Sequence, residues 1–401
     1  MHKTWPREVQ QMDTQTNHQE FPLLSVCIRA HNIEKELLDR CISSVVHQTY
    51  TNIEIILVNN ANKDDTGIYC DSWSQKDHRI RVIHSQENKT FLESVEYATG
   101  DYIHILDNDD WLAPDMYSKM MSAMLSTNSD IARCEFCFAY PDGQIVHRNI
   151  THKSKDFEVI GREEGVLLLL ENNKWQSYYW QNIFKKQIFN HHIPLSDKEY
   201  DDLSCTHILF NYAFQTVYLH DVFYFYYQRP GSKINPLTFQ GKVFIQYCRY
   251  NSIYKRYLFV KQHPQYHNML QPIKKEVVFL NIWSLWNMIE YPQYFTDNAY
   301  EMQVEQLKQF SLSLQDGILF FLNLDLLILK KIPRCYKPFY KIFYRNLKRI
   351  YYFTKACFKS LQPQNIQRRI NKTEITATVV SIITTQYLKC LCLAVNDKII
   401  S

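Results

Sequence analysis

The chain has 401 residues and a formal net charge of +4 at pH 7, and 46% of its residues are hydrophobic. This is enough for one large or two ordinary domains with a proper core, and the mild charge does not require nucleic acid as a partner, so we expect none. Residues 1–22 are polar and lack the apolar core of a signal peptide, which argues against export and predicts a flexible tail, a cytoplasmic protein and reduced cysteines.

Apolar runs alternate with helix-like segments through the first part of the chain. Runs typical of buried strands occupy residues 23–30, 53–58 and 80–84, and another begins at Tyr102. Segments with helical character lie between them, at 35–48, 66–76 and 91–98. This alternation through short links predicts an α/β fold with a mostly parallel sheet wound with helices.

The fourth apolar run ends in a cluster of acids, Asp107, Asp109 and Asp110. Ligands of open α/β sheets bind outside the carboxyl ends of the strands, and a small set of carboxylate oxygens suits a hard divalent cation that keeps positions for water and phosphate. The cluster therefore predicts a metal site. The alternative is a solvated acidic turn that caps a helix starting near Pro114.

Further elements follow this turn in chain order. The patterns predict a helix at 114–125, a hairpin of 131–140 and 144–148, a helix at 162–171, and aromatic strands at 215–219 and 222–228. A second pair of acids, Asp201 and Asp202, opens an apolar helix-like run. Acids in that position are favoured by the helix dipole, or they serve as a general base.

Motifs spread over these elements resemble family 2 glycosyltransferases of the GT-A fold. They are LSVCIRAHN at 24–32, HQTY at 47–50, NIEIILVN at 52–59 and DNDDWL at 107–112. The resemblance implies a Rossmann-like GT-A catalytic domain at 23–235. It also implies an inverting enzyme that moves a sugar from a nucleotide diphosphate donor, first of all a UDP-sugar, to a hydroxyl of a glycan or lipid-linked acceptor in bacterial cell-surface polysaccharide synthesis.

The resemblance also implies roles for individual residues. The donor would be bound by Ala30, Asn32, Asn60, Asp64, Lys89, Asp107 and Asn108. Asp109, with Asp107, would hold manganese or magnesium. Asp202 would be the catalytic base, while Trp180 and Asp201 would contact the acceptor.

Some positions depart from the family's pattern. Asn60 stands where the family usually has an aspartate, although an amide can still donate and accept hydrogen bonds. The segment 87–92 lacks the family's usual glycine and arginine, so Lys89 either supplies the missing positive charge or is an exposed loop lysine. Trp180 also fits a half-buried core position.

The last part of the chain, 236–401, is expected to be mainly helical. Within it, 331–361 combines an apolar, aromatic stripe with a basic one, and no acid occurs between Asp325 and Glu374. Such a segment suits an anionic inner-membrane surface and predicts a peripheral protein on the cytoplasmic face. The alternative is a helix packed on the protein with a solvated basic face.

Two other functions remain open on the sequence alone. The departures at Asn60 and in 87–92 fit a non-catalytic scaffold or membrane-docking protein that has lost nucleotide binding, although the acids at Asp107, Asp109 and Asp202 argue against it. A nucleotidyltransferase would need a glycine-rich phosphate loop near the first strand, and none is present in the sequence.

Overall fold

The computed structural model describes residues 21–147, 156–193, 200–229, 232, 237–296 and 298–310. The chain divides into two compact units. Unit 1 holds the residues up to Gly161, with Tyr179–Ile193 and Tyr212–Tyr227. Unit 2 holds Arg162–Tyr178, 200–211 and the described residues between Gln228 and Phe310. Two segments that precede residue 235 cluster with the C-terminal helices, and the predicted domain boundaries stay predictions.

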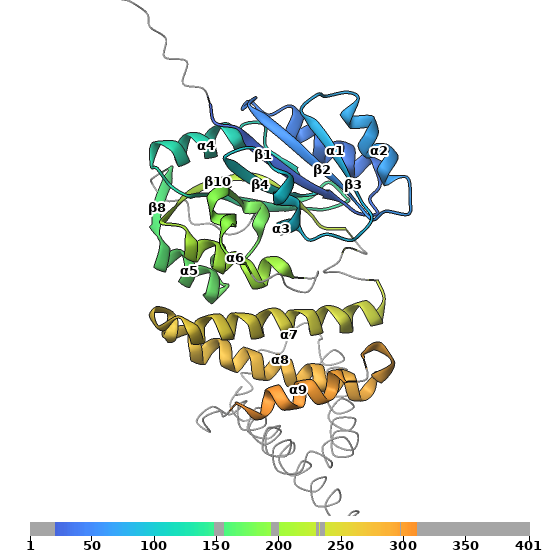
Figure 1. The fold of residues 1–401 in the computed structure, drawn as a ribbon, viewed down its shortest axis with the longest axis vertical. Coiled ribbons are helices and arrows are strands. Elements are labelled where there is room, and N and C mark those ends of the chain that lie inside the picture. The colour runs from blue at the N-terminus through green and yellow to red at the C-terminus, as the bar shows by residue number, and fades with distance from the viewer. Residues whose placement is uncertain are drawn as a thin grey trace, which may run out of the picture. The chain divides into compact units, whose positions relative to one another are not determined.

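Unit 1 is built on a sheet whose first part is parallel (Figure 1). The strands β1 (Leu24–Ala30), β2 (Ile53–Asn60), β3 (Ile80–Ser85) and β4 (Tyr102–Asp107) lie in the order β3-β2-β1-β4. The helices between them are α1 (Lys35–Val46), α2 (Thr66–Ser74) and α3 (Phe91–Ser94). Every residue of β1 is buried, as the continuous apolar run predicted for a central parallel strand. These predicted strands and helices are confirmed.

The remaining strands make the sheet mixed. They are β5 (Trp111–Leu112), β6 (Ile131–Ala139), β7 (Ile145–His147), β8 (Phe157–Gly161), β9 (Asn182–Lys185) and β10 (Gln215–Tyr227), with α4 (Met116–Ser126) after β5. The hairpin of β6 and β7 is confirmed. β9 pairs antiparallel with both β4 and β6, so the parallel order of β1 to β4 is interrupted there, and parallel pairing returns between β6 and β10. The α/β fold class itself is confirmed.

One strand was predicted as two. β10 runs from Gln215 to Tyr227 without a break, whereas the polar pair His220 and Asp221 suggested separate strands at 215–219 and 222–228. Its pairing with β6 shifts register between Tyr218 and Val222. Because this irregularity absorbs the polar pair, the strand continues instead of ending there.

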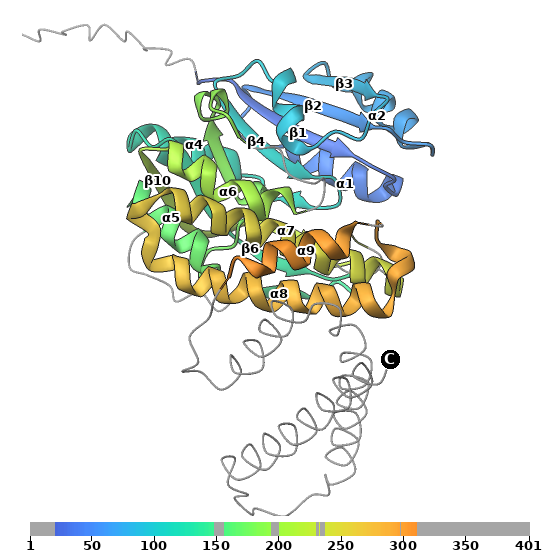
Figure 2. The same ribbon diagram turned by 60° about the horizontal axis from the view of Figure 1, so that its bottom comes forward.

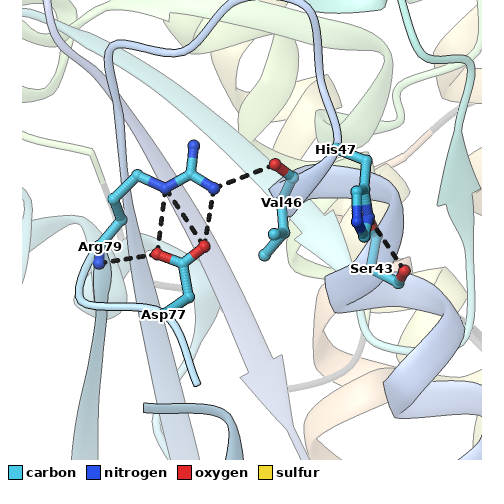
Figure 3. A network of polar contacts seen from close by, with 5 residues as sticks. All are labelled: Ser43, Val46, His47, Asp77 and Arg79. Carbon is cyan, nitrogen blue, oxygen red and sulfur yellow. Dashed lines mark hydrogen bonds and ion pairs between the residues drawn. The ribbon is translucent and has the colours of Figure 1, made fainter. Parts of the chain in front are cut away.

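The amino end of β3 is tied to the end of α1 by Arg79 (Figure 3). Arg79 donates from Nε and Nη2 to the carboxylate of Asp77, at 3.0 and 2.7 Å, and from Nη2 to the Val46 carbonyl at 3.0 Å. This network therefore lies at the amino end of β3, away from the edge where the strands end. His47 extends the end of α1, with Nδ1 2.8 Å from the Ser43 carbonyl oxygen.

Unit 2 is helical in its described residues. It contains α5 (Arg162–Glu171), α6 (Asp201–Tyr212), α7 (Phe239–Gln262), α8 (Leu270–Glu290) and α9 (Ala299–Lys308), of which α7, α8 and α9 lie side by side in both views (Figure 1 and Figure 2). Short 3-10 turns occupy Pro264–Met269 and Pro292–Tyr294, and in unit 1 they occupy Val95–Tyr97, Tyr179–Gln181 and Lys186–Asn190. The predicted helical C-terminal region is thus confirmed over 239–308.

A buried arginine joins the parts of unit 2. Arg256 of α7 donates from Nε to the Leu203 carbonyl at 2.7 Å, from Nη1 to the Leu169 carbonyl at 3.1 Å, and from Nη2 to the Ser177 hydroxyl. Its side chain is 1% exposed, and burial lowers its pKa to about 10. One cation therefore satisfies acceptors on α5, on α6 and on the segment between them.

No helix among the described residues is both long and apolar enough to cross a membrane. The predicted membrane-association segment, 331–361, and residues 1–20 of the predicted tail lie outside the described residues.

Candidate functional site

The carboxyl ends of the parallel strands bring several predicted donor-binding residues to one edge of unit 1. Ala30, Asn60 and Asp107 are the last residues of β1, β2 and β4. In the strand register, Ala30 pairs with Asn59 of β2, and Arg29 pairs with Asp107 of β4. The structure thus places the first and fourth strand motifs side by side, at the edge where α/β sheets bind ligands.

The acidic turn after β4 contains acids in two different environments. Asp107, Asn108 and Asp109 are partly exposed, while Asp110 is fully buried. The Asp110 carboxylate accepts hydrogen bonds from the Tyr224 hydroxyl at 2.6 Å and the Tyr227 amide at 2.7 Å. Burial, followed by the negative charges of Asp109 and Asp107, raises the pKa of Asp110 well above its usual range. Asp110 therefore fixes the turn to β10, while Asp107 and Asp109 are the partly exposed acids of the turn.

Arg40 of α1 holds the other side of this turn. It donates from Nη2 to the Asp109 carbonyl at 2.9 Å, and its guanidinium carbon lies 3.9 Å from the centre of the Trp111 ring and 4.4 Å from that of Tyr227. Burial lowers the pKa of Arg40. No role for Arg40 could be predicted from the sequence, because a charged residue on a helix gives no sign of the turn it will contact.

Asn60 organises the loop after β3. Its Nδ2 donates to Asn88 Oδ1 at 2.6 Å and to the Lys89 carbonyl at 3.1 Å, and its Oδ1 accepts from the Lys89 amide at 2.7 Å. Asn60 is fully buried, so this amide holds the loop. The predicted roles of Asn60 and of the Lys89 side chain in donor binding stay predictions.

The loops after β1 and β2 are joined by Asn62. Its Nδ2 donates to the Ala30 carbonyl at 2.9 Å, and its Oδ1 accepts from the Asn32 amide at 2.7 Å. Asn32 has a positive φ of 43°, which this contact helps to hold. Asp64 is exposed and accepts from the Thr66 amide at 3.1 Å where α2 begins. Ala30 and Asn32 thus meet in one joined loop pair, and Asp64 follows it on the chain.

Trp180 lies in an aromatic cluster of unit 1. Its ring is stacked on Tyr224, with centroids 4.1 Å apart, and meets Phe136 edge-on at 4.9 Å. The side chain is 5% exposed. This arrangement corresponds to the core position weighed in the sequence analysis, and contact between Trp180 and an acceptor stays a prediction.

Asp201 and Asp202 open α6 in unit 2. The Asp202 carboxylate accepts from the Leu203 amide at 2.6 Å, and Asp201 Oδ1 accepts from the Asp202 amide at 3.0 Å. Asp201 is 7% exposed and Asp202 is partly exposed. Both acids therefore satisfy amides of the first turn, as expected at a helix N-terminus. Their predicted roles toward the acceptor stay predictions.

The donor set at the turn fits a hard divalent cation with few protein ligands. Among the described residues no group of three or more His, Cys, Asp and Glu side chains is arranged to hold a metal ion. Magnesium and manganese sites on phosphorylated substrates, however, need only one or two carboxylates, with water and phosphate completing the shell. Asp107 and Asp109 offer two such carboxylates, and their charges already act on Asp110.

The fold and the polar strand ends define an α/β protein with a candidate ligand site at the carboxyl edge of a central sheet. Comparison with known families then gives the particular class. Residues 25–223 match the family model described as glycosyl transferase family 2. The matched region contains nearly all of β1, the strands β2 to β9, the acidic turn, Trp180 and the whole of α6. The chain is a member of glycosyltransferase family 2.

Relatives with similar sequences carry the same designation. Glycosyltransferase GlyG of Streptococcus pneumoniae is 28% identical over 229 residues, which are 52% of this chain and 72% of that protein. The uncharacterized glycosyltransferases EpsJ of Bacillus subtilis and YibD of Escherichia coli are 25% and 24% identical. Those matches cover 53% and 57% of this chain, and 63% and 67% of the relatives. Several relatives therefore extend well beyond the shared region.

Solved structures of S. aureus TarS are also similar to this chain. TarS residues 1–349 in complex with UDP-GlcNAc give a TM-score of 0.44 and 14% identity, over 73% of this chain and 95% of that one. The complex with UDP gives a TM-score of 0.43 and 13% identity, over 71% and 78%.

Proposed function

We propose that this family 2 glycosyltransferase is a metal-dependent, inverting enzyme that transfers a sugar from a nucleotide diphosphate to a hydroxyl of a glycan or lipid-linked acceptor. The observation that carries the proposal is the pair of partly exposed acids, Asp107 and Asp109, at the carboxyl edge of β4. β4 pairs with β1, which ends at Ala30, and β2, which ends at Asn60, lies on the other side of β1. A UDP-sugar is our first choice of donor.

The residues of the acidic turn divide the work. Asp107 and Asp109 would hold manganese or magnesium, and the metal when bound offsets the negative charge that develops on the departing diphosphate, typically a contribution of several kcal/mol. Asp110 and Arg40 keep the turn in place through Tyr224 and the Asp109 carbonyl. The two metal-binding side chains are therefore oriented before any donor arrives, which lowers the cost of binding it.

Asp202 is the proposed base. A sugar hydroxyl is a poor nucleophile, and removal of its proton during attack is typically worth about 10²–10⁴-fold in rate. Asp202 accepts that proton while the hydroxyl oxygen bonds to the anomeric carbon and the bond to the diphosphate breaks. One displacement inverts the configuration at that carbon. Asp201 and Trp180 are proposed to contact the acceptor.

The cellular setting is part of the proposal. The basic, aromatic segment 331–361 suits an anionic inner-membrane surface, which is where a lipid-linked acceptor would be found. The relatives in Streptococcus, Bacillus and Escherichia support a bacterial enzyme. We propose a peripheral protein on the cytoplasmic face that builds a cell-surface polysaccharide.

The test is release of nucleoside diphosphate from UDP-, GDP-, dTDP- and CDP-sugars, with manganese and with a chelator. Asp109→Asn should lower metal-dependent release by about a hundredfold or more, since loss of a carboxylate ligand removes charge stabilisation worth about 3 kcal/mol. Asp115→Asn is the matched control, because Asp115 lies a few residues later and pairs with Lys119 at 3.0 Å. Its release should equal that of wild type.

Two results would contradict the proposal. Equal release of nucleoside diphosphate by wild type and Asp109→Asn would refute the proposed metal site at Asp109. If no donor is cleaved, calorimetry with the four nucleoside diphosphates decides between a slow transferase and the non-catalytic alternative. Binding without cleavage fits a transferase that lacks its acceptor, whereas no binding of any nucleotide favours the scaffold.

A further inference from the structure

Arg29 is a charged side chain near the carboxyl end of β1, the strand between β2 and β4. It is the penultimate residue of β1, a strand in which every residue is buried, and its own side chain is 8% exposed. A guanidinium at such a position must be compensated, because removing it from water without a partner is costly. The sequence alone gives this arginine no role, as it stands inside an apolar motif.

The contacts of Arg29 orient its guanidinium without neutralising it. Nη1 donates to the Lys89 carbonyl at 2.7 Å, and the guanidinium carbon lies 4.1 Å from the centre of the Phe91 ring. Within the ranges that the structure describes, Arg29 forms no ion pair, and its Nε and Nη2 donate to no protein group. A positive charge with two unused donors is thus held in a fixed direction.

The guanidinium lies at the carboxyl edge of the sheet. Arg29 pairs in register with Val58 of β2 and with Asp107 of β4, the first acid of the turn. The Lys89 carbonyl that it contacts also accepts from Asn60 at 3.1 Å. Arg29 therefore stands between the loop after β3 and the strand that delivers the proposed metal ligands.

We propose that Arg29 is a donor-binding residue that donates to phosphate oxygens of the nucleoside diphosphate. This inference rests on the proposed function and names a residue that carries it. A planar fork of donors matches phosphate oxygens better than an ammonium does. The negatively charged diphosphate would then lie between two positive charges, the guanidinium of Arg29 and a metal at Asp107 and Asp109. Arg29 takes the role that the sequence analysis offered to Lys89.

The competing explanation is that Arg29 only anchors the loop 88–91. The two explanations differ in which part of the nucleotide they affect. A phosphate-binding arginine changes the affinity for a diphosphate and leaves the affinity for the nucleoside. Loss of a loop anchor disturbs both, because the same loop is attached to Asn60 through three further hydrogen bonds.

The experiment is calorimetry of wild type, Arg29→Met and Arg29→Lys with UDP and with uridine, in the presence of manganese. If wild type binds GDP, dTDP or CDP instead of UDP, that diphosphate and its nucleoside replace UDP and uridine. Arg29→Met should weaken diphosphate binding about ten- to hundredfold, as expected for loss of a charge-assisted hydrogen bond. Uridine affinity should change by less than about threefold by the same reasoning. The affinity of Arg29→Lys for the diphosphate should lie between those of wild type and Arg29→Met, because lysine keeps the positive charge and lacks the planar fork of donors.

Arg79→Met is the matched control, since Arg79 is a well-bonded arginine at the opposite end of β3 (Figure 3). It should bind UDP as wild type does. Equal losses of UDP and uridine in Arg29→Met, or no loss of either, would overturn the assignment while wild-type binding keeps the proposed function. If wild type binds none of the four diphosphates, the proposed function fails and the assignment falls with it. Far-UV circular dichroism reports whether Arg29→Met has folded, so that a loss of both ligands by a folded variant counts against the assignment.

Discussion

His104 should make unit 1 less stable as the pH falls. It lies at the centre of β4, fully buried. Its Nδ1 is 2.8 Å from the Tyr117 hydroxyl, and its Nε2 is 2.9 Å from the Trp180 carbonyl. A neutral ring satisfies both contacts, with Nε2–H donating to the carbonyl and Nδ1 accepting from the hydroxyl. A protonated ring would lose the hydrogen bond from Tyr117 and bring a charge into the core.

The magnitude follows from the pKa. Burial lowers the pKa of His104 from 6.5 to about 4. The unfolded chain therefore takes up a proton first when the pH drops below about 6.5, and the free energy of unfolding decreases until the folded ring is protonated near pH 4. A difference of about 2.5 pKa units corresponds to about 3 kcal/mol. This contribution is fully present above pH 6.5 and lost between pH 6.5 and 4.

The assay is urea unfolding of wild type and His104→Gln at pH 7.5, 6, 5 and 4. At neutral pH the variant should be less stable than wild type, because it loses the fitted ring. The gap between the two proteins should then narrow by about 3 kcal/mol toward pH 4. His47→Gln, at an exposed position, is the control for a histidine substitution. Parallel stability curves for wild type and His104→Gln over this range would refute the reasoning.

Two substitutions should destabilise the units by packing and by hydrogen bonding. In Gly100→Ala the new Cβ would lie 2.5 Å from the Leu23 carbonyl oxygen, so calorimetry should show a loss of about 1–3 kcal/mol. Gly161→Ala, whose Cβ would meet nothing within 4 Å, should not show that loss. In urea unfolding, Arg256→Met should lower the free energy of unfolding of unit 2 by about 3–5 kcal/mol, because buried acceptors lose a charged donor. Arg249→Met removes a half-exposed ion pair with Glu276 and should lower it by less than about 1 kcal/mol. Equal losses for either matched pair would contradict the explanation.

The sequence predicted the regular elements well because their signals are local. The continuous apolar run of β1 and the helical spacing of α1 were sufficient to place both. Pairing between distant segments has no such signal. β9 has only four residues, and nothing in them states that it will insert between β4 and β6. The mixed part of the sheet was therefore beyond the reach of a pattern analysis.

The position of the candidate site could be predicted from the sequence, but the burial and the contacts of its individual side chains could not. The acids after β4 were found because they end an apolar strand. Their environments were not, since the burial of Asp110 depends on Tyr224, more than a hundred residues away in the chain. The same holds for Trp180, which an aromatic motif suggested as a ligand contact and which packs against Tyr224 and Phe136. Residue type gives the chemistry available, and burial decides how it is used.

The two departures from the family's pattern are linked in the structure. An aspartate at position 60 could accept from the Lys89 amide, but it could not donate to Asn88 Oδ1 and the Lys89 carbonyl, both of which Asn60 contacts. That carbonyl also accepts from Arg29. The amide at 60 and the arginine at 29 thus serve one loop.

Two independent losses would favour a chain that has abandoned nucleotide binding. The structure argues the other way, because Arg29 of β1 donates to the Lys89 carbonyl, within the segment that lacks the family's arginine. The cation that the sequence analysis found missing from 87–92 is present beside that segment, on β1. The departures therefore no longer support the non-catalytic alternative. They favour a site in which a guanidinium acts on the donor from a different strand.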